Sequence, residues 1–182
     1  MGLDTKHLVA EPVARDPEAL ASGFRRAMRR LAATVSIVAT REDGVNVGMA
    51  ATSVSSLSAA PPSLLFSLAH TASLCQPLLR QGRFSVNILT LDHAPLVGLF
   101  SGQIKGPERF HHGAWEIVDD LPVLADAQAA LLCRIAAHHG FEGQEIVVGQ
   151  IEAIRVREQI FPLLWQDAQV AETHPLGSTR AA

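Results

Sequence analysis

The chain has 182 residues, of which 48% are hydrophobic, and a formal net charge of −3 at pH 7. These values predict one folded domain of ordinary size and exclude a disordered or collagen-like chain. A pI near 6.2 gives no overall basic field, so nucleic acid is excluded as a principal partner. Cys75 and Cys133 stand far apart and form no CxxC pair, which argues against a disulfide framework and a four-cysteine zinc site.

The two ends of the chain differ from its centre. Residues 1–16 are mixed and poorly periodic, and the last residues, ETHPLGSTRAA, are polar with Pro and Gly. This pattern predicts tails at 1–16 and 169–182 around a folded domain at 17–168. No segment reaches the roughly 20 apolar residues of a membrane helix, and the N-terminus does not resemble a secretory signal. We therefore expect a cytoplasmic protein that does not bind a membrane.

The first predicted element is a helix that begins at Pro17. Asp16 is a suitable N-cap, proline is favoured at the first helical position, and apolar residues recur at three- and four-residue spacing from Leu20 to Leu31. Arginines occupy the other faces, and we interpret them as the solvated side of the helix rather than a phosphate or nucleic-acid site. They are Arg25, Arg26, Arg29 and Arg30.

A β-hairpin is predicted next. TVSIVAT, from Thr34, is rich in β-branched residues, Asp43-Gly44 is a turn signal, and VGMAATSVSSLS predicts one long second strand at 47–58. Pro61-Pro62 ends that strand, because proline has no backbone N–H to donate.

The remaining elements alternate short helices with strands, without an internal repeat. We expect strands at 63–69, 83–91, 129–137, 145–156 and 161–167, short helices at 73–80 and 92–100, the second capped by Asp92, and a loop at 101–115. Few strands are separated by helices long enough for parallel crossovers, so the pattern predicts a closed or partly open antiparallel barrel with small helices around it.

Common catalytic and metal-binding motifs are absent from the sequence. It contains no GxGxxG, GxxxxGK[ST], HExxH or GxSxG. The pairs His111-His112 and His138-His139 are adjacent residues, which on a strand point to opposite faces and cannot both bind one metal easily. We predict no metal site.

The stretch VGMAATSVSSLSAAPPSLLFSLAHTAS, residues 47–73, combines hydroxyl groups and small side chains. In one extended strand, alternate residues share a face. One face then has Ala50, Thr52, Val54, Ser56 and Ser58, and the other has Ala51, Ser53, Ser55 and Leu57. Small side chains let a flat heteroaromatic ring approach the backbone, whose polar groups satisfy the edge of the ring. Ser67, Thr71 and Ser73, close to a helix N-terminus, suit a phosphate; an exposed Ser/Thr-rich strand is the other interpretation.

A series of segments from Phe24 to Trp165 resembles, in chain order, the short-chain flavin reductase family. The segments are FRRAMRRLAATVSIVAT, GMAATSVSSLSAAPP, GRFSVNIL, LFSG followed by ERF, LPVL with ALLCRIA, IVVGQIEAI and PLLW. Members of this family are the small reductase components of two-component flavin-dependent monooxygenases. The resemblance implies a mainly β fold, an FMN-binding split β-barrel with small flanking helices, in a homodimer.

The resemblance also implies an activity and a set of binding residues. The expected activity is an NAD(P)H:flavin oxidoreductase that transfers hydride from NADH or NADPH to FMN or FAD and supplies reduced flavin to a partner monooxygenase. Flavin and nicotinamide carry the redox chemistry, so no protein nucleophile is required. The implied flavin-binding residues are Thr52, Ser53, Val54, Ser55, Ser58, Ser67, Leu68, Ala69, Thr71, Ser73, Ser101 and Gly102.

The sequence departs from the family pattern just before the strand IVVG. Many relatives have Gly-Asp-His there, with the histidine on the nicotinamide side, whereas this chain has Gly143-Gln144-Glu145. A carboxylate near a dinucleotide pyrophosphate is unfavourable at short range. His138 and His139 are candidate substitutes for the histidine, and no catalytic residue is assigned.

Two alternatives to this function stay open. The reduced flavin could serve another acceptor, such as a corrinoid cobalt or a ferric chelate. The chain could also be a flavin-binding electron carrier without nucleotide reductase activity, an alternative motivated by Glu145.

Overall fold

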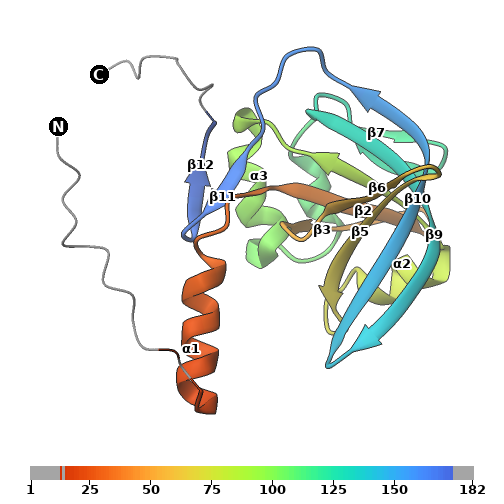
Figure 1. Cartoon of the computed structure of the whole chain (residues 1–182). Helices are drawn as coiled ribbons and strands as arrows, with labels where there is room; N and C mark the ends of the chain where they lie inside the picture. Colours follow the sequence, from red (N-terminus) through yellow and green to blue (C-terminus); the bar gives the residue numbers. More distant parts are fainter. Residues whose placement is uncertain (1–12, 14, 174–182) are drawn as a thin grey trace, which may run out of the picture. The chain divides into compact units, whose positions relative to one another are not determined.

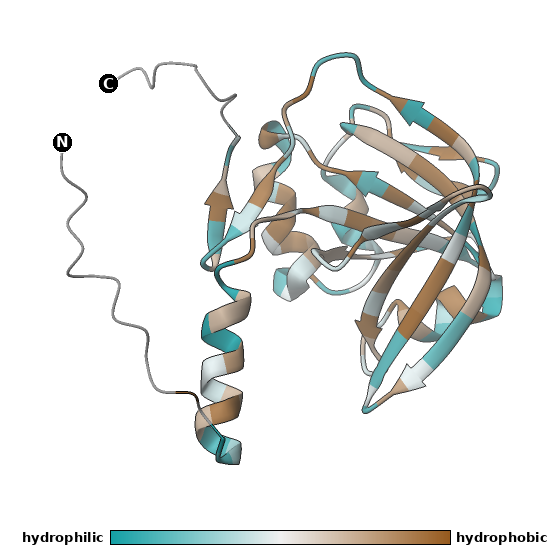
Figure 2. Ribbon diagram, viewed as in Figure 1, coloured by the Kyte–Doolittle hydropathy of each residue, from teal (hydrophilic) through white to brown (hydrophobic). Residues whose placement is uncertain are grey.

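The computed structural model describes residue 13 and residues 15–173, and the chain divides into two units between Leu31 and Ala32. The first unit holds α1 (Pro17–Met28), and the helix begins as predicted, because Asp16 Oδ1 accepts a hydrogen bond of 3.0 Å from the Ala19 amide. Its ribbon carries both apolar and polar residues (Figure 2). The predicted domain limits at 16 and 168 stay predictions.

The second unit is built around a seven-stranded antiparallel sheet in the order β3-β2-β6-β9-β10-β5-β4 (Figure 1). Its strands are β2 (Ser36–Glu42), β3 (Val45–Ala51), β4 (Ser55–Ala59), β5 (Pro62–Ala69), β6 (Arg83–Ile88), β9 (Ala129–Phe141) and β10 (Gln144–Val156). The prediction of a mainly β fold is confirmed. The turn between β2 and β3 lies at Asp43-Gly44, where both residues have positive φ.

The prediction of one long strand at 47–58 is wrong. The chain leaves β3 after Ala51 and enters β4 at Ser55, and these two strands form opposite edges of the sheet. Residues 52–54 therefore cross from one edge to the other, and the expected alternation of faces does not continue through them. A register shift between Ser56 and Ser58 breaks the alternation again within β4. Periodicity could not reveal this, because two strands joined by a short link have the same local pattern as one.

Strand β2 separates two apolar cores and contributes to both. Val38 packs in a core with Phe66, Phe84 and the buried residues of α2 (Cys75–Gln81), which are Cys75 and Leu78. Its neighbours Ile37 and Ala39 point the other way, into a second core. Both faces of β2 are buried as a result. Apolar residues recur along the strands of this unit (Figure 2). The second core supports the cavities described below.

Two small sheets complete the unit. Strands β1 (Ala33–Thr34), β11 (Leu164–Gln166) and β12 (Gln169–Ala171) form one, and β7 (Trp115–Val118) with β8 (Leu121–Leu124) forms the other. The sequence analysis did not predict β1, β7, β8 or β12. The β7–β8 hairpin is tied to the large sheet by Asn87, whose Oδ1 accepts from the Leu124 amide at 2.9 Å while its Nδ2 donates to Ile37 O at 3.2 Å.

The helices after β5 are short. α2 ends at Gly82, whose φ of 66° gives the left-handed cap expected of glycine. η2 (Leu91–His93) leads into α3 (Ala94–Gly98), and their predicted cap, Asp92, is wrong: the capping residue is Thr90, whose hydroxyl and amide lie 3.0 and 3.1 Å from His93 Nδ1. The predicted loop at 101–115 contains helical turns instead, η3 (Leu99–Gln103) and η4 (Pro107–His111).

Both cysteines of the chain are free and buried. Burial raises the pKa of Cys133 to about 12, and the charge of Glu152 adds to this effect. Neither thiol is therefore a reactive nucleophile at neutral pH. Within Val13 and residues 15–173, none of the helices combines the length and apolar character needed to cross a bilayer.

Candidate functional site

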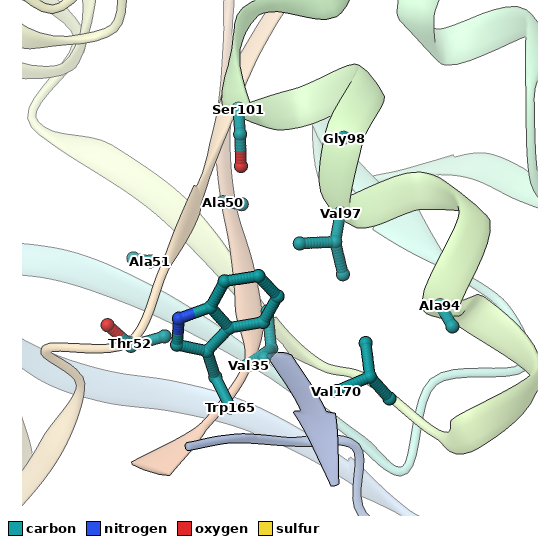
Figure 3. Close-up of a pocket in the computed structure, with 10 residues that line it drawn as sticks. All are labelled: Val35, Ala50, Ala51, Thr52, Ala94, Val97, Gly98, Ser101, Trp165 and Val170. Carbon is teal, nitrogen blue, oxygen red and sulfur yellow. The ribbon is translucent and has the colours of Figure 1, made fainter. Parts of the chain in front are cut away.

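Two neighbouring cavities lie where β3 meets α3 and the turns that follow it. The first, which we call the apolar cavity, has a volume of about 460 Å³. Its lining residues are Val35, Ala50, Ala51, Thr52, Ala94, Val97, Gly98, Ser101, Trp165 and Val170 (Figure 3). The indole of Trp165 projects between the end of β3 and the side chains of α3, so a flat aromatic surface forms part of the wall (Figure 3).

A buried histidine immediately before α3 fixes the position of this helix along the apolar cavity. His93 is 5% exposed, accepts or shares hydrogen bonds with Thr90 through Nδ1, and has its Nε2 3.1 Å from Asp126 Oδ1. Nδ1 is thus held by its hydrogen bonds with Thr90, whereas Nε2 lies close to Asp126 without a hydrogen bond to it. This arrangement orients the helix that supplies Val97 and Gly98 to the wall.

The second cavity, which we call the cationic cavity, has a volume of about 510 Å³. Its lining residues are Met49, Ala50, Ala72, Ser73, Phe100, Ser101, Gly102, Lys105, Gly106 and Arg109. Ala50 and Ser101 line both cavities, which therefore share a wall. Two cations and no carboxylate are among the lining residues, so the cavity suits an anionic group.

Arg109 is a buried cation in the lining of the cationic cavity. It is 6% exposed, its Nη1 donates to Gly48 O at 2.8 Å and its Nε donates to Gly106 O at 3.0 Å. Its guanidinium carbon also lies 5.7 Å from the centroid of the Phe100 ring. Burial lowers the pKa of Arg109, although a guanidinium stays charged at neutral pH. Its hydrogen-bond acceptors are neutral carbonyls, so a bound anion would offset the cost of burying its charge.

The turn that connects Ser101 to Lys105 depends on a glycine at position 102. Gly102 has a φ of 110°, a conformation that other residues rarely adopt, although a Cβ there would meet no atom within 4 Å. Its backbone conformation, rather than lack of space, requires glycine at this position. The turn brings Ser101 and Lys105 to the same cavity.

Four of the predicted flavin-binding residues line the cavities. Thr52 and Ser101 line the apolar cavity, and Ser73, Ser101 and Gly102 line the cationic one. The structure places the remaining eight outside both linings: Ser53, Val54, Ser55, Ser58, Ser67, Leu68, Ala69 and Thr71.

Several of these eight have structural partners. Ser53 Oγ donates to Ser67 O at 2.9 Å and accepts from the Ser67 amide at 3.2 Å, which joins the link before β4 to β5. Ser58 Oγ accepts from the Ala60 amide at 3.1 Å, and Leu68 is a core residue at 2% exposure. Their role in flavin binding stays a prediction.

Glu145 lies in a cluster with two histidines. The side chain is buried, with His70 Nε2 2.9 Å from its Oε2 and His138 Nδ1 2.6 Å from its Oε1. The hydrogen bond from His138 is the main cause that lowers the pKa of Glu145, and the bond from His70 adds to it. His139 pairs with Ile146 across β9 and β10 and belongs to the opposite face of the sheet. Of the two candidate histidines, the structure brings only His138 to Glu145.

Sequence analysis missed four residues of these sites. Lys105 and Arg109 lie in a segment that composition marked only as a loop, and Trp165 lies in a short strand without an assigned role. His70 belongs to no local sequence motif, because its partner Glu145 is 75 residues away in the chain. Within the described residues, no group of three or more His, Cys, Asp or Glu side chains is placed to hold a metal ion.

Comparisons with known proteins give a consistent result. The Flavin reductase like domain family matches residues 28–174. The reductase component of the FADH(2)-dependent resorcinol hydroxylase of Rhizobium sp. (strain MTP-10005) is 37% identical over 164 residues, which cover 88% of this chain and 92% of that protein. The FMN reductase (NADH) RutF of Methylorubrum populi is 36% identical over 148 residues, which cover 81% of this chain and 73% of that protein.

Solved structures share the fold. The flavin reductase domain protein from Arthrobacter sp. FB24 aligns with a TM-score of 0.80 at 30% identity, over 87% of this chain and 98% of that one. A homologue of nitrilotriacetate monooxygenase component B from Mycobacterium thermoresistibile aligns with a TM-score of 0.81 at 25% identity, over 91% and 93%. The expected split β-barrel is confirmed, and the chain belongs to the flavin reductase-like domain family.

Proposed function

We propose that this chain is an NAD(P)H:flavin oxidoreductase that reduces FMN or FAD and supplies the reduced flavin to a partner monooxygenase. The observation that carries the proposal is the pair of cavities with a common wall, one apolar with an indole in it and one cationic. A flavin mononucleotide has the same two parts, a flat apolar tricycle and an anionic phosphate. Relatives named as an FMN reductase and as a hydroxylase reductase component support the same activity.

The flavin ring occupies the apolar cavity in this proposal. The small side chains of Ala50 and Ala51 let a planar ring approach β3, and Trp165 offers it an aromatic face. Thr52 and Ser101 supply hydroxyl groups to its polar edge. The residues that follow Thr52 complete the flavin site with their backbone, as the resemblance to the family implies. They are Ser53, Val54, Ser55 and Ser58.

The phosphate of the flavin occupies the cationic cavity. Lys105 and Arg109 provide positive charge, and Ser73 provides a hydroxyl. The segment leading to Ser73 is the turn predicted from the sequence to hold this part of the ligand, with Ser67, Leu68, Ala69 and Thr71. When bound, flavin accepts a hydride from the nicotinamide ring, and the task of the protein is to place the two rings together and exclude water.

Glu145 gives no reason to prefer the electron carrier without reductase activity. Both of its carboxylate oxygens are occupied by imidazole nitrogens, at 2.9 and 2.6 Å. A buried carboxylate with two hydrogen-bond donors does not present a free negative charge to a dinucleotide. We therefore favour the reductase.

Activity tests this function directly. The purified protein, mixed with NADH or NADPH and with FMN or FAD, is expected to oxidise the nucleotide in a flavin-dependent reaction that is followed at the absorbance of the reduced nicotinamide. A preparation that binds flavin but oxidises neither nucleotide would instead support the carrier. A preparation that binds no flavin at micromolar concentration contradicts both.

The placement of the ring has its own prediction. Replacing Trp165 with alanine is expected to weaken FMN and riboflavin binding alike, about tenfold, because stacking on an aromatic side chain contributes about 1–3 kcal/mol. Isothermal titration calorimetry measures both dissociation constants. Trp165→Phe keeps an aromatic face and is the matched control, with an expected change below about threefold. An unchanged riboflavin affinity in the alanine variant would place the ring elsewhere.

A homodimer is part of the proposal, because one face of the sheet exposes apolar side chains. On β9 and β10, Phe141 and Ile146 are 63% and 38% exposed, and Val148 and Leu65 continue the same face by register. Ile146→Glu is expected to shift the protein from dimer to monomer in sedimentation velocity. Ile160→Glu, at a residue that follows β10 and is 76% exposed, should stay dimeric. A monomeric wild type would exclude this assembly.

A further inference from the structure

Glu145 joins two histidines at the end of the β9–β10 hairpin, and we call the three residues the Glu145 bridge. Glu145 faces Leu68 on β5 and Gly140 on β9 in register, so it lies at the centre of three paired strands. Its side chain is 8% exposed, while those of His70 and His138 are 45% and 51% exposed. A buried carboxylate is thus covered by two imidazoles, one from β9 and one from the residue that follows β5.

The carboxylate holds both rings as an ionised acceptor. An ionised carboxylate offers only acceptor sites, so the N–H groups at His70 Nε2 and His138 Nδ1 each donate a hydrogen bond to it. Charge-assisted bonds of this kind are shorter and stronger than neutral ones. The lowered pKa of Glu145 agrees with this arrangement, and its charge also helps to raise the pKa of the Cys75 thiol.

His70 connects this bridge to the wall of the cationic cavity. It is the first residue after β5, and its amide donates to Gly143 O at 2.9 Å, so backbone and side chain both attach it to the β9–β10 hairpin. The turn that follows is closed by bonds from the Ala72 amide to Ala69 O at 2.9 Å and from the Cys75 amide to Ala72 O at 3.0 Å. Ala72 and Ser73, within that turn, line the cationic cavity.

We infer that Glu145 is a positioning residue which, through His70, holds the turn at residues 71–74 in the shape that binds the anionic end of the ligand. The inference rests on the proposed function in one respect only, that the anion is the phosphate of a flavin. The turn is short and has no strand partner of its own, so the side-chain bond of His70 limits its movement. His138 lies on β9 and does not belong to the turn, so it steadies the carboxylate without positioning Ser73.

Flavin binding by variants of the bridge tests the inference. Glu145→Gln is expected to raise the dissociation constant of FMN about tenfold and that of riboflavin, which has no phosphate, less than about twofold, because preorganisation of the phosphate turn is lost. In steady-state assays the KM for FMN should rise more than kcat falls. His70→Gln, at an exposed side chain, should give the same pattern, and the double variant should be no worse than either single one.

The matched control is Glu152→Gln. Glu152 is on the same strand, with its carboxylate in surface ion pairs with Arg83 at 3.2 Å and Arg134 at 3.7 Å. Its replacement should leave the FMN dissociation constant within about twofold, since exposed ion pairs contribute little. Equal losses of FMN and riboflavin affinity in Glu145→Gln, or additive effects of Glu145→Gln and His70→Gln, would overturn the inference.

Hydrogen exchange separates this inference from the proposed function, because it needs no flavin. In the free protein, the amides of Ala72 and Cys75 should exchange at least about tenfold faster in Glu145→Gln and His70→Gln than in wild type and Glu152→Gln. Unchanged protection of these amides overturns the positioning role even if the protein reduces flavin. Faster exchange in a protein that binds no flavin keeps the positioning role and removes the flavin.

Discussion

Replacing Arg109 with methionine is expected to raise the dissociation constant of FMN about thirtyfold, because a hydrogen bond between charged groups contributes about 2 kcal/mol. Riboflavin binding should change less than about threefold, since it places no phosphate in the cationic cavity. The substitution also removes the donors to Gly48 O and Gly106 O, so a lower unfolding midpoint is expected. Calorimetric titrations with both flavins, below that midpoint, measure the effect on binding.

Two further variants separate the effect of positive charge on FMN binding from the effect of lost structural hydrogen bonds in the cationic cavity. Lys105 is exposed, and Lys105→Gln removes a positive charge without leaving a buried carbonyl unpaired. It should weaken FMN binding about fivefold at low salt, less than Arg109→Met, because an exposed charge is screened by solvent. Arg155→Gln, which breaks a surface ion pair with Glu116, is the matched control and should change nothing. Equal losses for FMN and riboflavin in Arg109→Met would show that phosphate binds elsewhere.

Gly149→Ala is expected to destabilise the fold by about 2 kcal/mol, because a side chain inserted in a packed core forces its neighbours to move. A Cβ at this position would lie 2.5 Å from Phe84 Cζ and 3.3 Å from Cys133 Cβ. Phe84 is fully buried and packs against Phe66 with ring centroids 5.4 Å apart, so a shift of its ring would disturb the packing of both phenylalanines. Urea unfolding followed by far-UV circular dichroism gives the free energy of unfolding.

Gly23→Ala is the control for this prediction. Gly23 lies inside α1, and a Cβ there meets no atom within 4 Å. Alanine favours a helix over glycine by up to about 1 kcal/mol, so this variant should be as stable as wild type or slightly more so. An unchanged unfolding midpoint for Gly149→Ala would mean that β10 accommodates the methyl group at the irregularity in its pairing with β9 between Val148 and Gly149.

The sequence predicted best those elements whose signals are local. Asp16 and Pro17 determine the start of α1, Asp43-Gly44 determines the first hairpin, and Pro61 lies in the turn between β4 and β5. Each signal acts within a few residues, through a cap, a positive φ or a missing N–H group.

Elements that depend on distant partners were not predictable in this way. The β7–β8 turn uses Asp119 and Asp120 with φ of 49° and 64°, not the Asp-Gly pair that marks such turns, and Pro122 lies within β8, where a proline argues against a strand. The hydroxyl of Ser85 donates to the carbonyl of Pro122, a contact that no local pattern announces.

The candidate site also contains residues that the sequence predicted and residues that only the folded structure reveals. Thr52, Ser73, Ser101 and Gly102 were predicted through the resemblance and line the cavities. Arg109 reaches its position through a hydrogen bond to Gly48, 61 residues earlier in the chain. Its burial beside a cavity is a property of the folded chain, because in sequence it is one arginine in a polar loop.

The apolar and cationic cavities share a wall at Ala50 and Ser101, and this proximity affects the affinity for a ligand that fills both. A molecule whose ring and phosphate are covalently linked, once held at one end, presents the other end to its cavity at a high effective concentration. The linked molecule should therefore bind far more tightly than a ring compound and inorganic phosphate supplied together. Selectivity for the complete nucleotide then follows from the distance between two modest subsites, without a strong contact at either.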